Sequence, residues 1–598
     1  MIKVEKLSYS FPTKDLYNKV SFSLEENQHA VLIGSNGTGK TTLVQLLMNP
    51  DDFLYDGKIK KNIDGRIGYV SQFEKSEKER DITVFDFLSE DFVHLQEKME
   101  AVCAEMETAQ DFDALMERYQ QILDESMAVD ADNYESNIHK ELKTAGLSDL
   151  ANLSISVISG GEYKLLQVIR QMLQKPSLLI MDEPDAFLDF DNLKGLKNLI
   201  NDYQGTLLVV THNRYLLNHC FDKILHLENA DIQEFDGNFV EYNFALLAKK
   251  MELQELSAKQ QEEIDRSRKM VERMRADATK FVNASFGRSL HAKVSYLERL
   301  EARKIKEPFV NLRQPNIVLP QLPAFACEGL DEAPTSTEPV DVLTLKDYAI
   351  SFEDTLLENV CFSLKENEKV AIVGANGTGK TTMLRDIFKN AKDSIWVSPE
   401  VEIGFLSQIH GEMLNETHTI YEEMEEMDDT FANRKEIEEY LSGYCFDEEM
   451  LSSKIEVLSG GEKNLLQLAK IGRSHAKLLL LDEPTSHLDT YAQIALERAI
   501  SEYQGAVLMV SHDFYTIVNC ADYVLFVENK GIRKMRTRSF RKMIYEEHFK
   551  MEYLELEQKK KELELRIESY LLKHDFESAK ALCEQLGDII ERMKSKMI

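Results

Sequence analysis

Cysteine is scarce in this chain and never forms a metal-binding or redox motif. The seven cysteines are odd in number and include no Cys-x-x-Cys pair; they stand at positions 103, 220, 327, 361, 445, 520 and 583. This pattern argues against a disulfide framework and against a zinc site. We therefore expect a protein of a reducing compartment, the cytoplasm.

Long apolar segments are also missing. A membrane-spanning helix needs about 18 or more consecutive apolar residues, and no such run occurs in the sequence. The first residues, 1–9, alternate like an opening strand and contain no apolar secretory core. We expect neither export nor a membrane span.

Basic residues are outnumbered. The chain has 71 Lys and Arg against 104 Asp and Glu, a formal net charge of −33. Proteins bind phosphate backbones through Lys and Arg, so the charge of the whole chain argues against a nucleic-acid partner. Any contact with RNA must therefore be local.

A glycine-rich phosphate loop is present twice. Residues 34–41 read Gly-Ser-Asn-Gly-Thr-Gly-Lys-Thr, and residues 374–381 read Gly-Ala-Asn-Gly-Thr-Gly-Lys-Thr. Each loop follows a short apolar run and precedes a helix-compatible segment, as a P-loop requires. The loops predict these ATP-binding residues: Gly34, Asn36, Gly37, Gly39, Lys40, Thr41 and Thr42, then Gly374, Asn376, Gly377, Gly379, Lys380, Thr381 and Thr382.

The chemistry of the loop explains these residue types. Backbone N–H groups converge on the phosphates, while Lys40 or Lys380 neutralises the β- and γ-phosphates and Thr41 or Thr381 ligates Mg²⁺. Later motifs recur at a period of 300 residues, which is too long for a solenoid repeat. The sequence therefore predicts two complete α/β domains and the cofactors ATP and Mg²⁺.

Acidic pairs close an apolar strand in each half. Asp182-Glu183 follows four apolar residues, and so does Asp482-Glu483. Ligands bind at the carboxyl ends of strands in open α/β sheets. We expect the aspartates to bind magnesium and the glutamates to orient or polarise the attacking water. The alternative, solvated strand ends, is disfavoured because the apolar run recurs in both copies.

A histidine ends the next apolar strand of each half. His212 and His512 each lie 30 residues after the aspartate of their acidic pair. A lone histidine after a strand is more often structural than catalytic. The shared register favours a role at the γ-phosphate for both.

The Ser-Gly-Gly motifs complete the pattern. Ser159, Gly160 and Gly161 begin 23 residues before the first acidic pair, as Ser459, Gly460 and Gly461 do before the second. Alone, each motif would be an ordinary turn. With the P-loops, the acidic pairs and the histidines, they resemble the ATP-binding-cassette ATPases.

The resemblance implies roles for further residues. Ser-Gly-Gly would be the signature motif, Gln72 and Gln408 the Q-loop ligands of Mg²⁺ and ATP, and the two histidines the γ-phosphate switch. It also implies head-to-tail pairing, with one ATP between Lys40 and Ser459 and another between Lys380 and Ser159. Phe11 and Phe352 are candidates for stacking on adenine, with core packing as an equal alternative.

The two halves differ between the Q-loop glutamine and the signature. This interval is 87 residues in the first half and 51 in the second, so 36 extra residues fall around 89–140. Their helical spacing predicts a helical hairpin added to the domain, which we call the arm. A solvated subdomain without a partner is the alternative.

A charged segment, 246–308, joins the halves. Its pattern predicts two antiparallel helices with a tip at about 279–288, and a helix of about 35 residues would extend about 50 Å. Residues 264–306 carry 12 Lys or Arg against 5 Asp or Glu. A solvated charged face is the bland alternative. RNA contact is favoured by the tip residues, which are Lys280, Phe281, Phe286 and Arg288.

These features divide the chain into five parts. The ranges are 1–245 for the first cassette domain, 246–308 for the helical-hairpin linker, 309–340 for an extended connector, 341–545 for the second cassette domain, and 546–598 for a helical C-terminal extension. What the C-terminal helices pack against is not determined by the sequence.

The chain most resembles the ABC-F family, soluble twin-cassette ATPases that act on the ribosome. Residues 482–489 read Asp-Glu-Pro-Thr-Ser-His-Leu-Asp, close to the family motif, whereas Asp185-Ala186-Phe187 departs from it in the first half. This departure places equal turnover at the two sites in doubt. The resemblance implies a monomer whose cassettes close on ATP in the ribosomal E site.

In that family the linker reaches toward the P-site tRNA and the 23S rRNA of the peptidyl-transferase centre. Long linkers resemble the antibiotic-resistance subgroup, so the sequence-based hypothesis is ribosome protection. A translation factor of the same family is the first alternative. A third interpretation, the ATPase subunit of a membrane importer, does not explain the arm or the basic linker. A fourth, a DNA-repair ATPase, would require zinc motifs or a very long coiled coil within a cassette, and the sequence has neither.

Overall fold

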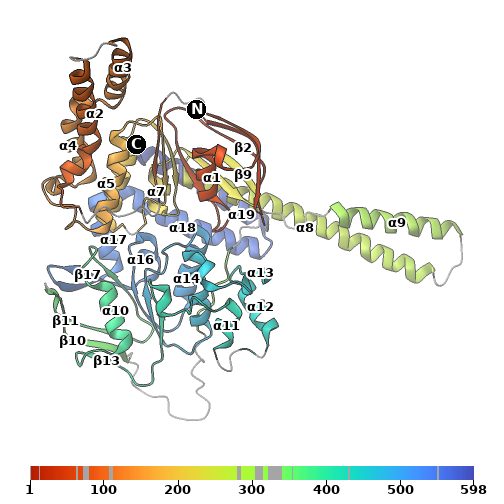
Figure 1. The fold of residues 1–598 in the computed structure, drawn as a ribbon. Coiled ribbons are helices and arrows are strands. Elements are labelled where there is room, and N and C mark those ends of the chain that lie inside the picture. Colours follow the sequence, from red (N-terminus) through yellow and green to blue (C-terminus); the bar gives the residue numbers. More distant parts are fainter. Residues whose placement is uncertain are drawn as a thin grey trace. The chain divides into compact units, whose positions relative to one another are not determined.

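The computed structural model describes residues 2–11, 14–61, 65–71, 80–106, 112–186, 188–278, 284–303, 314–320, 340–352, 355–427, 431, 433–548 and 551–597 (Figure 1). Gln72, Phe187, Lys280 and Phe281 lie outside these residues, as does most of the predicted connector. The chain divides into two compact units. Unit 1 is Met1–Asp236 with Arg313–Lys542, and unit 2 is Gly237–Leu312 with Met543–Ile598.

The first half of unit 1 contains a six-stranded sheet in the order β5-β6-β7-β3-β8-β9 and a three-stranded sheet, β2-β1-β4. Its strands are β1 Ile2–Phe11, β2 Lys14–Leu24, β3 His29–Ile33, β4 Asp56–Lys61, β5 Ile67–Val70, β6 Leu178–Asp182, β7 Thr206–Val210, β8 Lys223–Glu228 and β9 Asp231–Asp236. Its helices are α1 Lys40–Met48, α2 Val84–Met106, α3 Phe112–Val129, α4 Tyr134–Ala145, α5 Gly160–Leu173, α6 Phe190–Asp202 and α7 Arg214–His219, with 3-10 turns η1 Pro50–Asp52, η2 Ala131–Asn133 and η3 Ser148–Leu150.

The second half repeats this plan, with sheets β14-β15-β16-β12-β17-β18 and β11-β10-β13. Its strands are β10 Asp341–Ser351, β11 Thr355–Lys365, β12 Lys369–Val373, β13 Ile395–Val397, β14 Ile403–Leu406, β15 Leu478–Asp482, β16 Ala506–Val510, β17 Tyr523–Glu528 and β18 Gly531–Arg536. Its helices are α10 Lys380–Lys389, α11 Ile420–Glu425, α12 Arg434–Ser442, α13 Glu448–Leu451, α14 Gly460–Gly472, α15 Thr490–Glu502 and α16 Phe514–Cys520, with 3-10 turns η4 His410–Glu412 and η5 Ile455–Val457.

The apolar strands form the centre of each large sheet. In both halves these strands run parallel, and only the last hairpin, β8-β9 or β17-β18, is antiparallel. Every residue of β6, β7, β15 and β16 is buried. Strands covered on both faces read as continuous apolar runs rather than alternating ones. The parallel arrangement brings the polar residues that follow these strands to one edge of each sheet.

The extra segment of the first half forms α2 and α3, which pack against each other. Helix α2 begins at Val84, before position 89, and α4 continues to Ala145 and packs on α5 and α6. The apolar stripe of α2 is buried, and Phe92 stacks on Tyr134 with ring centroids 5.3 Å apart. Helix α4 therefore attaches this helical segment to the signature helix, α5.

Part of the connector is described, at residues 314–320. The backbone N–H of Asn316 donates to the Gly443 carbonyl oxygen at 2.7 Å, and the Val318 N–H donates to the Tyr444 hydroxyl at 3.1 Å. Ile317 and Leu319 are buried. These residues contain no helix or strand, and they pack on the end of α12.

Unit 2 contains two helical pairs. They are α8 Phe239–Ala278 with α9 Ala284–Arg303, and α18 Met551–Leu572 with α19 Phe576–Met597; α17 Thr537–His548 leads into the second pair. Helix α8 begins before position 246 because Asn238 caps it. The Asn238 side chain accepts from the Glu241 N–H at 2.9 Å, and the Glu241 carboxylate accepts from the Asn238 N–H at 3.0 Å.

The C-terminal helices pack on α8. One apolar cluster joins Val240 and Met251 of α8 to Ile567 and Leu586. Two ion pairs flank it, from Lys580 to Glu255 at 2.5 Å and from Lys594 to Glu241 at 2.6 Å. The C-terminal extension thus braces the linker helix.

None of the helices in the described parts of the chain is long and apolar enough to cross a lipid bilayer.

Candidate functional site

The two glycine-rich loops join a buried strand to a helix, β3 to α1 and β12 to α10. Gly39 and Gly379 end the loops with φ of +97° and +88°. The lysine amino groups lie inside the loops: Lys40 Nζ donates to the Gly34 carbonyl at 2.9 Å, and Lys380 Nζ donates to the Gly374 carbonyl at 2.8 Å. Burial lowers the pKa of both lysines.

Each loop lysine thus occupies a buried position among backbone carbonyls. Several carboxylates of the site oppose the effect of burial on its pKa. A buried lysine whose hydrogen bonds go to neutral backbone carbonyls is suited to an anionic ligand. The loop N–H groups and the start of the following helix add to this preference for anions.

Asp182 and Asp482 end β6 and β15, and each is only 1% exposed. The Thr41 hydroxyl hydrogen-bonds Asp182, and Thr381 Oγ1 donates to Asp482 Oδ1 at 3.0 Å. The Oδ2 atom of each aspartate accepts no hydrogen bond within the described residues. Burial raises the pKa of Asp182, and it raises that of Asp482 to about 6.

These oxygen atoms fit a magnesium ion. Mg²⁺ prefers carboxylate and hydroxyl oxygens, typically one or two carboxylates together with phosphates and waters. Asp182 with Thr41, and Asp482 with Thr381, supply such a donor set. Gln408 lines the cavity beside Lys380, whereas Gln72 lies outside the described residues.

The glutamates that follow have an unusual backbone. Glu183 and Glu483 both have φ of +47°, in the left-handed region. Their backbone N–H groups donate to Val210 O at 2.8 Å and Val510 O at 2.9 Å. A non-glycine residue held in such a conformation is characteristic of functional sites. Because of burial, and secondly of nearby aspartates, the pKa of Glu183 rises to about 7 and that of Glu483 to about 8.

The histidines approach these glutamates from the next strand. His512 Nε2 lies 3.7 Å from Glu483 Oε1, and the His512 N–H donates to Glu483 Oε2 at 3.3 Å. Burial lowers the pKa of His512 to about 3 and that of His212 well below its usual value. Both rings are therefore neutral at physiological pH. His212 Nε2 makes no hydrogen bond to any described residue.

The signature serines cap helices. Ser159 Oγ accepts from the Glu162 N–H at 3.2 Å, and Glu162 accepts from the Ser159 N–H at 2.6 Å. Ser459 and Glu462 form the same capping box on α14. Both motifs therefore form the N-terminus of a helix, and a helix N-terminus favours an anionic group.

The halves contact each other head to tail. The Asn36 N–H donates to Asp489 Oδ2 at 3.2 Å, and the Asn376 N–H donates to Asp189 Oδ2 at 3.2 Å. Asn36 Nδ2 also donates to the His487 carbonyl at 2.8 Å. Asp189 and Asp489 were not predicted as site residues from the sequence. Their signal was present, because each aspartate stands at the same place after its acidic pair.

One cavity of about 520 Å³ combines residues of both halves. The first half contributes Gly160, Gly161, Glu183 and His212 to its wall. The second half contributes Asn376, Gly377, Gly379, Lys380, Thr381, Thr382, Gln408, Glu483 and His512. The signature of one half and the phosphate loop of the other thus line the same cavity.

The phenylalanines predicted to stack on adenine, and two of the predicted linker-tip residues, remain to be located. Phe11 is 46% exposed and Phe352 is 70% exposed, so neither ring packs in the core. Either ring is therefore accessible to a ligand. Phe286 and Arg288 fall on α9, whose backbone is described at these positions.

The two sites are chemically unequal. In the first half, Thr211 Oγ1 donates to Asp185 Oδ1 at 2.6 Å, and burial raises the pKa of Asp185 to about 6. The corresponding residues of the second half are Thr485 and Ser511. The first half thus carries a carboxyl group, close to Glu183, that the second half lacks.

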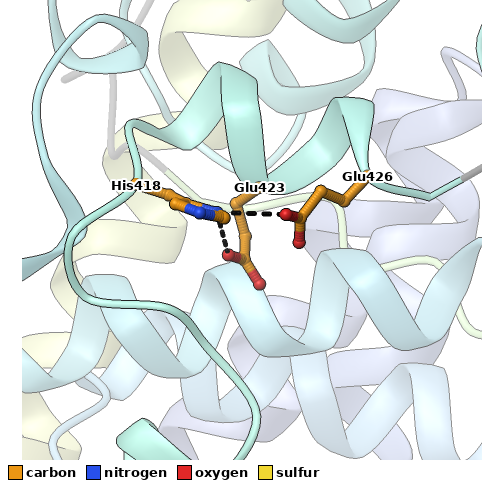
Figure 2. A group of neighbouring side chains, drawn as sticks. All are labelled: His418, Glu423 and Glu426. Atoms are coloured by element: carbon orange, nitrogen blue, oxygen red, sulfur yellow. Dashed lines mark ion pairs between the residues drawn. The ribbon is translucent and has the colours of Figure 1, made fainter.

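A separate group of side chains of metal-ligand types, the only one found among the described residues, lies in α11 and just beyond its two ends (Figure 2). His418 Nδ1 lies 3.4 Å from Glu423 Oε2 and 3.6 Å from Glu426 Oε1. Glu423 also pairs with Lys470 of α14 and accepts from the Asn415 N–H at 3.2 Å. With Lys470 already neutralising Glu423, we assign this group to joining α11 to α14.

Comparison with known proteins matches both halves of this chain to the same protein family. The profile described as "ABC transporter" matches residues 17–186 and 357–486, and an extension profile of the same description matches residues 225–312. One relative, ABC transporter F family member 5 of Arabidopsis thaliana, is 29% identical over 88% of this chain and 75% of its own. The uncharacterized ABC transporter ATP-binding protein YfmM of Bacillus subtilis is 28% identical over 86% of this chain and 96% of its own.

A third relative is the ribosome protection protein VmlR of Bacillus subtilis, 27% identical over 89% of this chain and 88% of its own. Among solved structures, the archaeal ribosome recycling factor aABCE1, in complex with the stalk protein aP1, aligns with a TM-score of 0.54 and 16% identity. The alignment covers 89% of this chain and 90% of that one. This likeness concerns the fold.

Proposed function

We propose that this chain, which belongs to the ABC transporter family and within it to the ABC-F family, binds the ribosome when ATP closes its two halves. The chain is an ATPase, with two copies of the family's ATP-binding domain. The ribosome is proposed as its partner and the cytoplasm as its location, with no transmembrane subunit. We expect a monomer, because both halves of the composite site are in one chain.

The geometry of unit 1 supports closure on ATP. Lys380 would neutralise the phosphates, and Gly160 and Gly161 of the other half line the same cavity. A ligand that touches both halves stabilises their contact by its binding free energy. Glu483 and His512 lie at the same cavity, so hydrolysis would remove the group that holds the halves together.

Magnesium would be held by the threonine and aspartate oxygens described above, and it would supply charge neutralisation of the phosphates. Glu183 and Glu483 would position and polarise the attacking water. The neutral imidazoles of His212 and His512 would hydrogen-bond to the γ-phosphate region. The aspartates, glutamates and histidines in these roles are buried or half-buried side chains at the carboxyl edge of a sheet.

The observation that carries the ribosome proposal is the charge of the linker. Residues 264–306 have 12 Lys or Arg against 5 Asp or Glu, inside a chain of net charge −33. Helix α8 alone has 40 residues, about 60 Å at the usual helical rise. A long basic helical hairpin suits RNA more than it suits a membrane subunit. A relative named for ribosome protection adds support.

Cosedimentation with ribosomes tests this proposal. The chain with Glu183→Gln and Glu483→Gln is expected to pellet with ribosomes in the presence of ATP, because closure would persist without hydrolysis. The same variant without ATP, and a Lys40→Ala, Lys380→Ala double variant with ATP, are the controls and should stay in the supernatant. An equal amount in the pellet with and without ATP would contradict the proposal.

The finer role we propose is protection of the ribosome from drugs of the peptidyl-transferase centre. Its support is the long linker and the likeness to a ribosome protection protein. Shortening residues 281–287 is expected to abolish resistance in a susceptible host while ATP-dependent ribosome binding persists. Minimum inhibitory concentrations with and without each version measure this. Unchanged susceptibility on expression of the intact chain would favour a housekeeping translation factor.

A further inference from the structure

The side chain of Arg214, in the first half of unit 1, contacts residues of the second half. Arg214 begins α7, two residues after His212, and its side chain is 10% exposed. Its Nη2 atom lies 2.7 Å from Asp513 Oδ2 in the second half and also pairs with Glu497. The guanidinium further lies 5.0 Å from the centre of the Tyr515 ring. Arg214 thus joins the halves through a largely buried charge cluster.

The partners of Arg214 are held in place by their own half. Glu497 accepts from the Thr516 hydroxyl at 2.9 Å and from Asn519 Nδ2 at 2.8 Å. Asp513 Oδ2 shares the proton of that hydroxyl, at 2.7 Å from Thr516 Oγ1, and Asp513 Oδ1 caps α16 by accepting from the Tyr515 N–H at 3.0 Å. Two nearby carboxylates in a largely buried place require a cation, and Arg214 supplies it from the opposite half.

The Arg214 cluster includes a residue that is adjacent in the chain to the proposed catalytic residue His512. Asp513 follows His512, whose backbone N–H donates to Glu483 at 3.3 Å. Glu497 lies on α15, whose N-cap Asp489 accepts from the Asn36 N–H of the first half. Arg214 therefore fixes the loop of the second half that carries His512, whereas Asp489 is held by its own capping bonds to the Tyr491 and Ala492 N–H groups.

The equivalent positions in the other half do not repeat this charge cluster. At the position matching Arg214, the second half has Phe514, whose ring centre lies 6.2 Å from that of Phe190. The residues of the first half that match the partners of Arg214 are Lys197, Asn213 and Leu216, none of which is acidic. Arg214 and its partners thus hold the loop of His512 and have no counterpart at the loop of His212.

We propose that Arg214 is a positioning residue for ATP hydrolysis at the site of Lys380 and Glu483, and that it has no equivalent at the site of Lys40 and Glu183. It holds Asp513, and with it the His512 loop, against the first half. This inference concerns the ATPase alone and does not depend on the ribosome as partner. If it is correct, turnover at the two sites is expected to respond unequally to the loss of Arg214.

The test separates the sites by blocking each in turn. Arg214→Met is placed in a Glu183→Gln chain, where only the second site turns over, and in a Glu483→Gln chain, where only the first does. In the former we expect kcat for ATP to fall by about 10-fold or more, with KM changed by less than about 2-fold, because the phosphate-loop contacts remain. In the latter kcat should change by less than about 3-fold.

Two further variants keep the test interpretable. Arg214→Lys should restore part of the lost kcat, because it keeps the cation but not the planar fork. Lys223→Met is the matched control, since Lys223 is 6% exposed and pairs with Glu234 at 2.7 Å within the first half; it should leave the ratio of the two turnover rates unchanged. If Arg214→Met does not fold, Arg214→Lys should show the same one-sided loss at smaller size. Equal losses at both sites, or no loss at the second site, would overturn the proposal.

Discussion

Replacing Glu183 and Glu483 together with glutamine is expected to lower the rate of ATP hydrolysis by about 10²- to 10⁴-fold, the usual contribution of a positioned general base. Glutamine keeps the shape of the side chain but cannot accept a proton from water. Both glutamates are held in the left-handed region, with φ of +47°, by hydrogen bonds from their own N–H groups to the neighbouring strand. The substitution therefore removes the chemistry without moving the backbone.

Phosphate release at saturating ATP measures this loss. Binding of ATP should persist, because Lys40 and Lys380 are unchanged, and retention of labelled nucleotide on a filter would show it. Glu528→Gln is the matched control, since Glu528 is an exposed strand end at which the substitution should have no effect. Turnover above about one tenth of the starting rate in the double variant would remove these glutamates from the mechanism.

Gly461→Ala is expected to disrupt the contact between the halves and to lower turnover at the Lys40 site by about 10-fold or more, as misplacement of site groups does. A Cβ atom on Gly461 would lie 2.3 Å from Asn36 Nδ2 and 2.4 Å from the His487 carbonyl oxygen. The second atom belongs to the backbone and cannot rotate away. The signature helix or the backbone at His487 must therefore shift, and the Asn36 side chain that donates to the His487 carbonyl must move with it.

Turnover in the Glu483→Gln chain, where only the first site is active, isolates this effect. Gly411→Ala is the matched control, because a Cβ atom there would meet nothing within 4 Å. It should leave turnover and ATP binding unchanged. If Gly461→Ala were as active as this control, the head-to-tail contact seen at Asn36 would not be the one used in catalysis.

Several parts of the site were predictable because they depend on local chemistry. The loops at Lys40 and Lys380 need glycine, lysine and threonine in a fixed order, and the acidic pairs need an apolar strand before them. Both requirements are visible along the sequence. Unit 2 was harder, because its helices were expected but the apolar cluster of α8 with α18 and α19 was not. An amphipathic sequence pattern predicts that a helix has an apolar face, but it does not specify which other helix covers that face.

Contacts between the halves were the least predictable. Asp189 and Asp489 recur in register, yet only the structure shows each accepting from the opposite phosphate loop. Arg214 gave no sequence signal, since its partners Glu497 and Asp513 lie about 300 residues away in the chain and have no counterparts in the first half. From the sequence alone, a charged residue such as Arg214 is expected to be exposed to solvent, because its partners in the folded protein are not known.

The sequence by itself determined the two α/β halves, the family and the phosphate-binding chemistry, because backbone periodicity and the glycine-rich loop are encoded by neighbouring residues. Only the tertiary structure decided how those halves meet, where α18 and α19 pack, and which half supplies the cation that Glu497 and Asp513 require. The physical reason is that burial changes the energetic role of a charge, and burial is a property of residues brought together from distant parts of the chain.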